Sequence, residues 1–210
     1  MPMGLGSFGA FNQIRGVIPD RRKPFDVGVA GPLAGLLVAL PALCPWLKGT
    51  AVAAGGTGVG VSSSVLLASL YATANGGPVP PDHVIALTPL AFAGWLGLLI
   101  TALNLIPIGQ LDGGYIAYAL FGRRRVKTGG WVALFHLAIL GIFYWSGWLN
   151  WALIVFFLGG VKHQPALNEL PIPGWRRSAI GAFAFILLFL IMAPVPHRFM
   201  SVVGLKCPYL

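Results

Sequence analysis

Charged residues are scarce in this sequence. They make up 9% of its 210 residues, while 57% are hydrophobic. A soluble domain carries about 25% charged residues. A soluble core of this length cannot bury so much apolar surface. The composition therefore excludes a soluble domain and indicates an integral membrane protein.

The sequence also has few cysteines and no recognisable signal-peptide pattern. The two cysteines, Cys44 and Cys207, are far apart in sequence, so neither a disulfide framework nor a cysteine metal site is indicated. Residues 1–9 contain no basic segment followed by an apolar one, so we predict no signal peptide. The net charge of +9 does not indicate nucleic acid, because the basic residues form short clusters between apolar runs. Clusters of this kind are typical of cytoplasmic loops.

Apolar runs predict a bundle of membrane-spanning helices. We expect the first span at about 27–46 and the last at about 178–192. Residues 47–82 are rich in Gly, Ser and Pro and predict an external loop with one short interfacial helix near 61–72. Residues 131–161 have tryptophans in their middle and basic residues on both flanks, which favours a tight hairpin of two short helices.

A polar interruption divides the second span. Apolar residues continue to Ile106, break at Pro107–Gln110 and resume from Tyr115 to Phe121. If the part before the break crossed the whole bilayer, the part after it would add a helix of only about 15 Å. That length would leave the basic cluster after Phe121 in hydrocarbon. We therefore expect one discontinuous span, whose exposed backbone lines a cavity or is buried in protein.

Asp112 is the acid inside this interruption. A carboxylate near the bilayer centre costs about 2.5–3.5 kcal/mol, which makes it a functional-site hypothesis. Gly113 and Gly114 follow, then an apolar run, so Asp112 is expected near the N-terminus of a half-helix that keeps it ionised. Two interpretations stay open. Either the ionised carboxylate is paired with a cation such as a metal ion, or Asp112 only caps its helix. Asn104 either donates into the same cavity or satisfies carbonyls freed by Pro107.

A known motif is similar to the interruption, Asn104-x-x-Pro107-x-x-x-Leu111-Asp112-Gly113-Gly114. It resembles the Asn-x-x-Pro-x-x-x-Leu-Asp-Gly motif of the site-2 protease family. Members of that family are intramembrane zinc metalloproteases of peptidase family M50. Further segments resemble bacterial members in the same order along nearly the whole chain. They are Gly6–Ala10 with Arg15, which is similar to a β-hairpin, Phe25-Asp26 through Gly31-Pro32-Leu33-Ala34-Gly35, His163-x-Pro165 and Pro194-x-Pro196.

The resemblance implies an all-α polytopic membrane protein with a broken span at Pro107–Gly114 and a short N-terminal β-hairpin. It implies a single domain over 1–210, made of a hairpin segment at 1–26, a transmembrane bundle at 27–193 and a tail at 194–210. Asp112 would be the third zinc ligand, and Asn104 would steady the scissile carbonyl. The structural motif residues would be Pro107, Leu111, Gly113, Gly114, Gly31, Pro32 and Gly35.

The same resemblance implies partners and a location. The substrate would be a transmembrane helix, for example that of a membrane-bound regulator, cleaved within the lipid bilayer. The membrane would be a bacterial inner (plasma) membrane. No nucleic acid partner is expected.

The family's His-Glu-x-x-His helix, which carries the other two zinc ligands and the general base, is missing from this sequence. No two of the four histidines, His83, His136, His163 and His197, are four residues apart. One aspartate cannot hold a catalytic zinc, so Zn²⁺ is expected in the complete family member and this chain alone is expected to be inactive. We expect an N-terminally truncated chain. The alternatives are a non-catalytic relative that binds membrane helices and, third, a small transporter.

Overall fold

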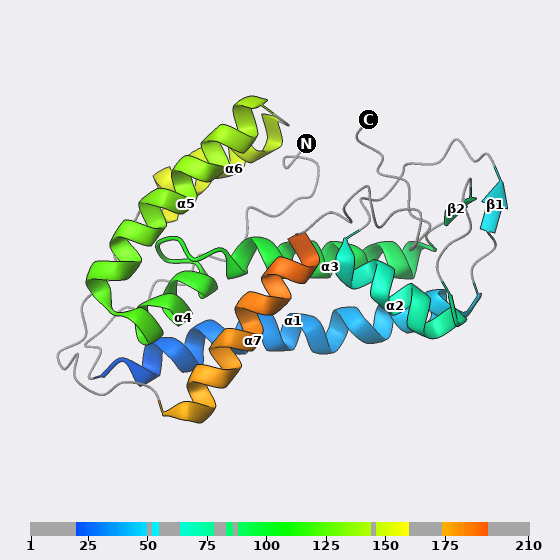
Figure 1. Ribbon diagram of the computed structural model, residues 1–210, viewed down its shortest axis with the longest axis horizontal. Coiled ribbons are helices and arrows are strands. Elements are labelled where there is room, and N and C mark those ends of the chain that lie inside the picture. The colour runs from blue at the N-terminus through cyan, green and yellow to red at the C-terminus, as the bar shows by residue number, and fades with distance from the viewer. Residues whose placement is uncertain are drawn as a thin grey trace. The chain divides into compact units, whose positions relative to one another are not determined.

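The computed structural model describes residues 20–49, 52–54, 64–77, 83–85, 88–143, 146–159 and 174–192. Figure 1 shows its helices and two short strands. The strands pair antiparallel, with Val52 opposite Ile85. In chain order the elements are α1 Arg22–Gly49, β1 Val52–Ala54, α2 Val65–Asn75, β2 His83–Ile85, α3 Pro89–Leu105, α4 Asp112–Phe121, α5 Arg123–Phe143, α6 Ser146–Ile154, the π-helical turn η2 Val155–Gly159 and α7 Trp175–Met192.

Within the described ranges, three helices are long and apolar enough to cross a membrane: Arg22–Pro45 within α1, all of α5 and all of α7. The first and last predicted spans are thus confirmed as helices α1 and α7. The described part of the chain is helical apart from β1 and β2, as the expected fold class requires. The predicted N-terminal β-hairpin lies outside the described residues.

The predicted hairpin at 131–161 is confirmed as the pair α5 and α6, but its helices are not both short. α5 has 21 residues and begins at Arg123, directly after Gly122. The basic residues Arg123, Arg124, Arg125 and Lys127 therefore lie in the first turns of a helix, where Arg and Lys have good intrinsic propensity. The two helices approach closely, because a Cβ at Gly141 would overlap the backbone of Leu149.

A short helix, α2, is present near the place predicted for the interfacial helix, but it begins four residues later; its location at the membrane interface stays a prediction. Ser64 begins it, since its Oγ accepts a hydrogen bond of 3.3 Å from the backbone N–H of Leu67. The strands β1 and β2 within the expected loop were not predicted, because segments of three residues are too short to show alternation of apolar and polar residues.

The chain divides into two compact units, of which one comprises Ala34–Ala102 and Leu187–Leu210. Within this unit, small residues bring α1 and α3 together. A Cβ at Gly35 would lie 2.5 Å from Oγ1 of Thr101, and a Cβ at Gly94 would lie 2.9 Å from the carbonyl oxygen of Ala39. Gly35 and Ala39, four residues apart on α1, thus let the backbones of the two helices approach closely.

The other unit comprises Met1–Leu33 and Leu103–Ile186, and α4 is its core. Eight of the ten residues of α4 are buried. The N-terminal part of α1 and the helix α7 pack against it, because a Cβ at Gly181 of α7 would lie 2.7 Å from Leu120 and 3.2 Å from both Ile116 and Phe25. A helix of ten residues is rarely stable alone, so this packing holds α4 in place.

The expected break between α3 and α4 is present. The residue before a proline is disfavoured in α-helix, and α3 accordingly ends at Leu105, two residues before Pro107. The N–H of Ile108 donates to the carbonyl of Ile106 at 2.8 Å, and the N–H of Leu111 donates to the carbonyl of Ile108 at 3.2 Å. Gly109, inside this second turn, has a φ of 49°, which glycine adopts without steric cost.

Gly113 and Gly114 are required by the close approach of this turn to α4. A Cβ at 113 would overlap the carbonyl oxygen of Leu105, and a Cβ at 114 would overlap that of Gly109. Glycine within a helix costs about 1 kcal/mol relative to alanine. Here the missing side chains allow α4 to begin directly against the end of α3.

We predict that Gly113→Ala lowers the free energy of unfolding by about 1–3 kcal/mol, since backbone rather than a flexible side chain must move. The matched control is Gly129→Ala in α5, where no atom lies within 4 Å of the added Cβ. This control should leave stability unchanged or raise it by up to about 1 kcal/mol. Thermal unfolding in detergent micelles, followed by circular dichroism, measures both. Equal stability of the two variants would contradict the close approach.

Candidate functional site

Asp112 is the first residue of α4 and is 3% exposed. The N-cap position is Leu111, whose backbone is extended and whose side chain makes no capping hydrogen bond. Asp112 is therefore an acid in the first turn rather than the cap residue itself. In that turn the free N–H groups and the helix dipole favour a negative charge.

The backbone of α1 forms a wall against Asp112. A Cβ at Gly31 would lie 2.7 Å from Oδ2 of its carboxylate, and a Cβ at Gly28 would lie 2.7 Å from its carbonyl oxygen. The sequence motif singled out Gly31 but not Gly28. Of the other motif residues, Pro32 is buried, and Gly35 borders Thr101 in the other unit.

The break carries two buried amide oxygens on either side of Pro107. Asn104 is 8% exposed, and within the described part of the chain its Oδ1 has no hydrogen-bond partner. The Oε1 atom of Gln110 is also buried without a hydrogen-bond partner among the described residues, and Gln110 was not a predicted site residue. Leu105 follows Asn104 and contacts the start of α4 through its carbonyl oxygen, so Asn104 lies next to the turn of the chain that carries Asp112.

Arg21 holds the other end of α4. Its Nη2 donates to the carbonyl oxygens of Tyr118 at 3.1 Å and Ala119 at 2.6 Å, and the residue is 7% exposed. These carbonyls belong to the last turn, where a helix leaves acceptors unpaired and favours a cation. In the sequence, Arg21 belongs to the short basic cluster Arg21-Arg22-Lys23, of a kind typical of cytoplasmic loops. Nothing local distinguishes it from Arg22 and Lys23, which are exposed.

The described residues do not form a metal site by themselves. Among them no group of three His, Cys, Asp or Glu side chains could hold a metal ion. His136 on α5 is exposed, and the side chain of His83 and all of His163 and His197 lie outside the residues described. A catalytic zinc needs three protein ligands, and the described residues bring no such set of three together around Asp112.

The amino-acid sequence matches a known protein family over most of its length. The model described as peptidase family M50 matches residues 2–143, which is more than half of the chain. The chain belongs to peptidase family M50. The site-2 protease resemblance of the Leu111–Gly114 motif is thereby confirmed at the level of the family.

Several proteins from plants are similar to this chain. The chain is 34% identical to the probable zinc metalloprotease EGY2, chloroplastic, of Arabidopsis thaliana over 203 residues, which are 93% of this chain and 35% of that protein. It is 34% identical to EGY1 of the same plant over 211 residues, 96% of this chain and 38% of that protein. It is 32% identical to EGY1 of Oryza sativa subsp. japonica over 195 residues, which are 90% of this chain and 34% of that protein.

The chain thus spans about a third of the length of these relatives. Their names agree with the zinc expected of the complete family member. Their plant origin gives no support to the expected bacterial type or to a bacterial membrane. No solved structure matches the chain.

We predict that Arg21→Gln destabilises the protein by about 2–3 kcal/mol, because charge-assisted hydrogen bonds to two helix-end carbonyls are lost in a buried place. Arg22→Gln is the matched control. It removes the same charge from an exposed neighbour and should change stability by less than about 0.5 kcal/mol. Chemical denaturation in detergent compares the two. If both variants lose the same stability, Arg21 does not hold α4.

Proposed function

We propose that this chain forms the part of an intramembrane zinc metallopeptidase that supplies the third metal ligand and one wall of the substrate cleft. The observation that carries the proposal is the buried carboxylate of Asp112 at the start of α4. A carboxylate removed from water is stabilised by a cation beside it, and aspartate oxygen is a ligand of Zn²⁺ together with histidine. The membership of family M50 supports the same role.

The other ligands have to come from outside the described residues. By the resemblance they are the two histidines of a His-Glu-x-x-His helix, which the relatives' greater length has room to include. The contribution of this chain is then the position of one ligand. The backbone of Gly28 and Gly31 on one side, and of Leu105 on the other, determines where the Asp112 carboxylate lies.

The substrate class we propose is a transmembrane helix, such as that of a membrane-bound regulator. A peptide bond within an intact helix has its N–H and carbonyl groups paired, so the substrate has to unwind where it is cut. The freed groups are costly in hydrocarbon unless they are paired again. The buried oxygens of Asn104 and Gln110 would accept substrate N–H groups, and the amide of Asn104 would donate to the scissile carbonyl.

The identity of the membrane in which this protein acts stays a prediction. The three span-length helices support an integral membrane protein, and the lipid bilayer is its proposed environment. The bacterial plasma membrane was inferred from motif resemblance alone.

A non-catalytic relative is the second candidate function. It is favoured by one observation: the described residues contain no group of three metal-binding side chains. Such a protein would bind membrane helices at the polar break between α3 and α4 without cutting them.

We predict that the DNA upstream of Met1, read in the same frame, encodes an apolar helix with His-Glu-x-x-His. Sequencing the locus tests this, and the proteolytic proposal requires such a helix to meet Asp112. A stop codon close upstream, with no such helix, would favour the non-catalytic candidate.

In the complete protein we predict that Asp112→Asn weakens zinc binding at least about 100-fold, since even residues that only orient a ligand contribute about 10–100-fold. Asp26→Asn is the control, because it removes an exposed carboxylate on α1 and should leave zinc content unchanged. Zinc per chain is measured by mass spectrometry after dialysis.

Asn104→Ala, in the same experiment, should keep its zinc while cleavage of a model transmembrane substrate falls about 10²–10³-fold. Unchanged zinc affinity in Asp112→Asn would contradict the ligand role. A complete native protein that binds no zinc would instead support the non-catalytic candidate.

A further inference from the structure

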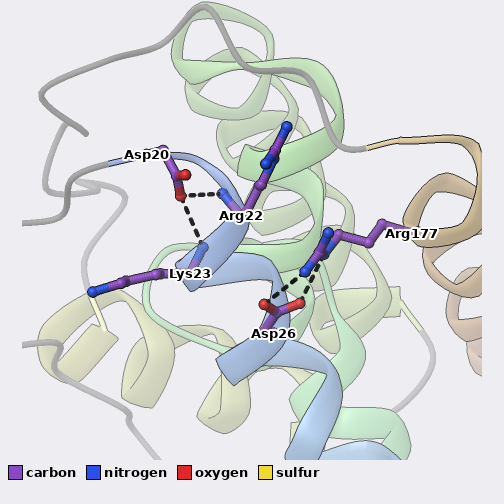
Figure 2. Close-up of polar contacts among 5 residues, drawn as sticks. All are labelled: Asp20, Arg22, Lys23, Asp26 and Arg177. Carbon is purple, nitrogen blue, oxygen red and sulfur yellow. Dashed lines mark hydrogen bonds and ion pairs between the residues drawn. The ribbon is translucent and has the colours of Figure 1, made fainter.

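The three span-length helices begin at one end of the same unit. Arg21, one residue before α1, binds the carbonyls of Tyr118 and Ala119 at the end of α4, and α5 starts two residues after α4 ends. Arg177, near the start of α7, binds Asp26 of α1 through both carboxylate oxygens, at 2.9 and 3.1 Å (Figure 2). These contacts bring the N-terminal ends of α1, α5 and α7 together.

Positive charge is concentrated at this end. Among the residues that the structure describes, nine Lys and Arg lie here, against two acids, Asp20 and Asp26. Seven of the nine are exposed, and within the described residues none of these seven is in an ion pair. We call them the basic end: Arg22, Lys23, Arg123, Arg124, Arg125, Lys127 and Arg176.

The two acids at this end do not neutralise the basic end. Asp20 uses Oδ1 to accept the backbone N–H groups of Arg22 and Lys23, at 3.0 and 3.4 Å. Asp26 is occupied by Arg177. Figure 2 shows the side chain of Lys23 directed away from both carboxylates. The exposed cations are therefore available to an anion from outside the chain.

Helix stability does not explain this arrangement. The N-terminus of a helix carries a partial positive charge, so cations there are unfavourable and acids are favoured. α1, α5 and α7 have no acid in their first turns. In contrast, α4 has Asp112 in its first turn and the Arg21 cation at its end, as the dipole favours. A negatively charged surface would stabilise the three basic helix starts at once.

Aromatic and apolar side chains accompany the basic end. Trp175 is 77% exposed, and the guanidinium of Arg176 lies 5.7 Å from the centre of its ring. Exposed Trp131 follows the α5 cations by one to two turns. Tryptophan beside arginine at the start of an apolar helix is typical of the lipid headgroup region, whereas a nucleic-acid surface would not be backed by lipid-facing side chains.

We propose that the basic end binds the anionic headgroups of phospholipids in one leaflet of the bilayer. The proposal concerns lipid selectivity and is independent of whether the protein cleaves substrates. Its chemistry is that of several cations against phosphate esters that carry a net negative charge, at a depth set by Trp175. Each Lys or Arg near such a surface strengthens the interaction severalfold at physiological salt.

The test is lipid selectivity of the full chain in reconstituted bilayers. Tryptophan fluorescence is quenched by brominated phosphatidylglycerol or by brominated phosphatidylcholine, and the ratio gives the preference for anionic lipid. We expect about a tenfold preference for the native chain and about twofold or less for the triple variant Arg123→Gln, Arg124→Gln, Arg125→Gln. The matched variant with lysine at all three positions should keep the native preference.

Three results would overturn the proposal. The first is a native preference near one, which would leave the cations as topology signals only. The second is an unchanged preference in the glutamine variant, provided that its circular dichroism matches that of the native chain. The third is displacement of the anionic lipid by millimolar inorganic phosphate or by a short oligonucleotide in equal measure, which would point to a soluble anion instead.

Discussion

The structure around the candidate site depends on one steric constraint, the contact of two backbone carbonyls with the start of α4. The oxygens of Leu105 and Gly109 occupy the space that side chains at 113 and 114 would need. This contact allows α4 to begin directly against the end of α3, after a turn of a few residues. It also brings Asp112, the first residue of α4, against the backbone of α1 at Gly28 and Gly31. A bulkier residue at any of these glycines would separate the elements and displace the carboxylate.

The second determinant is the electrostatics of helix ends. α4 carries its acid at the positive end and receives the Arg21 guanidinium at the negative end, so a short buried helix has compensated termini. The span-length helices α1, α5 and α7 have cations at their positive ends. At α1, Asp20 accepts the first backbone N–H groups, whereas α5 and α7 have no acid in their first turns. The difference follows from burial. Eight of the ten residues of α4 are buried, so the charges at its ends have to be neutralised from within, whereas the exposed helix starts can use anions from their surroundings.

Several features of the fold and site were predictable because they are written in local sequence. Long apolar runs identified α1 and α7, and Pro107 identified the break, since proline and the residue before it disfavour helix. The two glycines after Asp112 and the apolar run that follows placed it in the first turn of a half-helix. The length of α5 was not predicted, because its basic first turns were assigned to a loop from topology, while Arg and Lys are also good helix formers. The strands β1 and β2 are too short to leave a pattern.

The sequence by itself determined that this is a membrane protein of family M50 with a broken apolar segment around an aspartate. These conclusions rest on composition and on residues close together in the chain, which local physical chemistry governs. Only the tertiary structure decided that Gly28 borders Asp112, that the amide oxygen of Gln110 is buried, and that Arg21 rather than its neighbours caps α4. Arg21 lies 97 residues from Tyr118 in sequence. A contact across that separation depends on how the helices pack, and no local pattern encodes it.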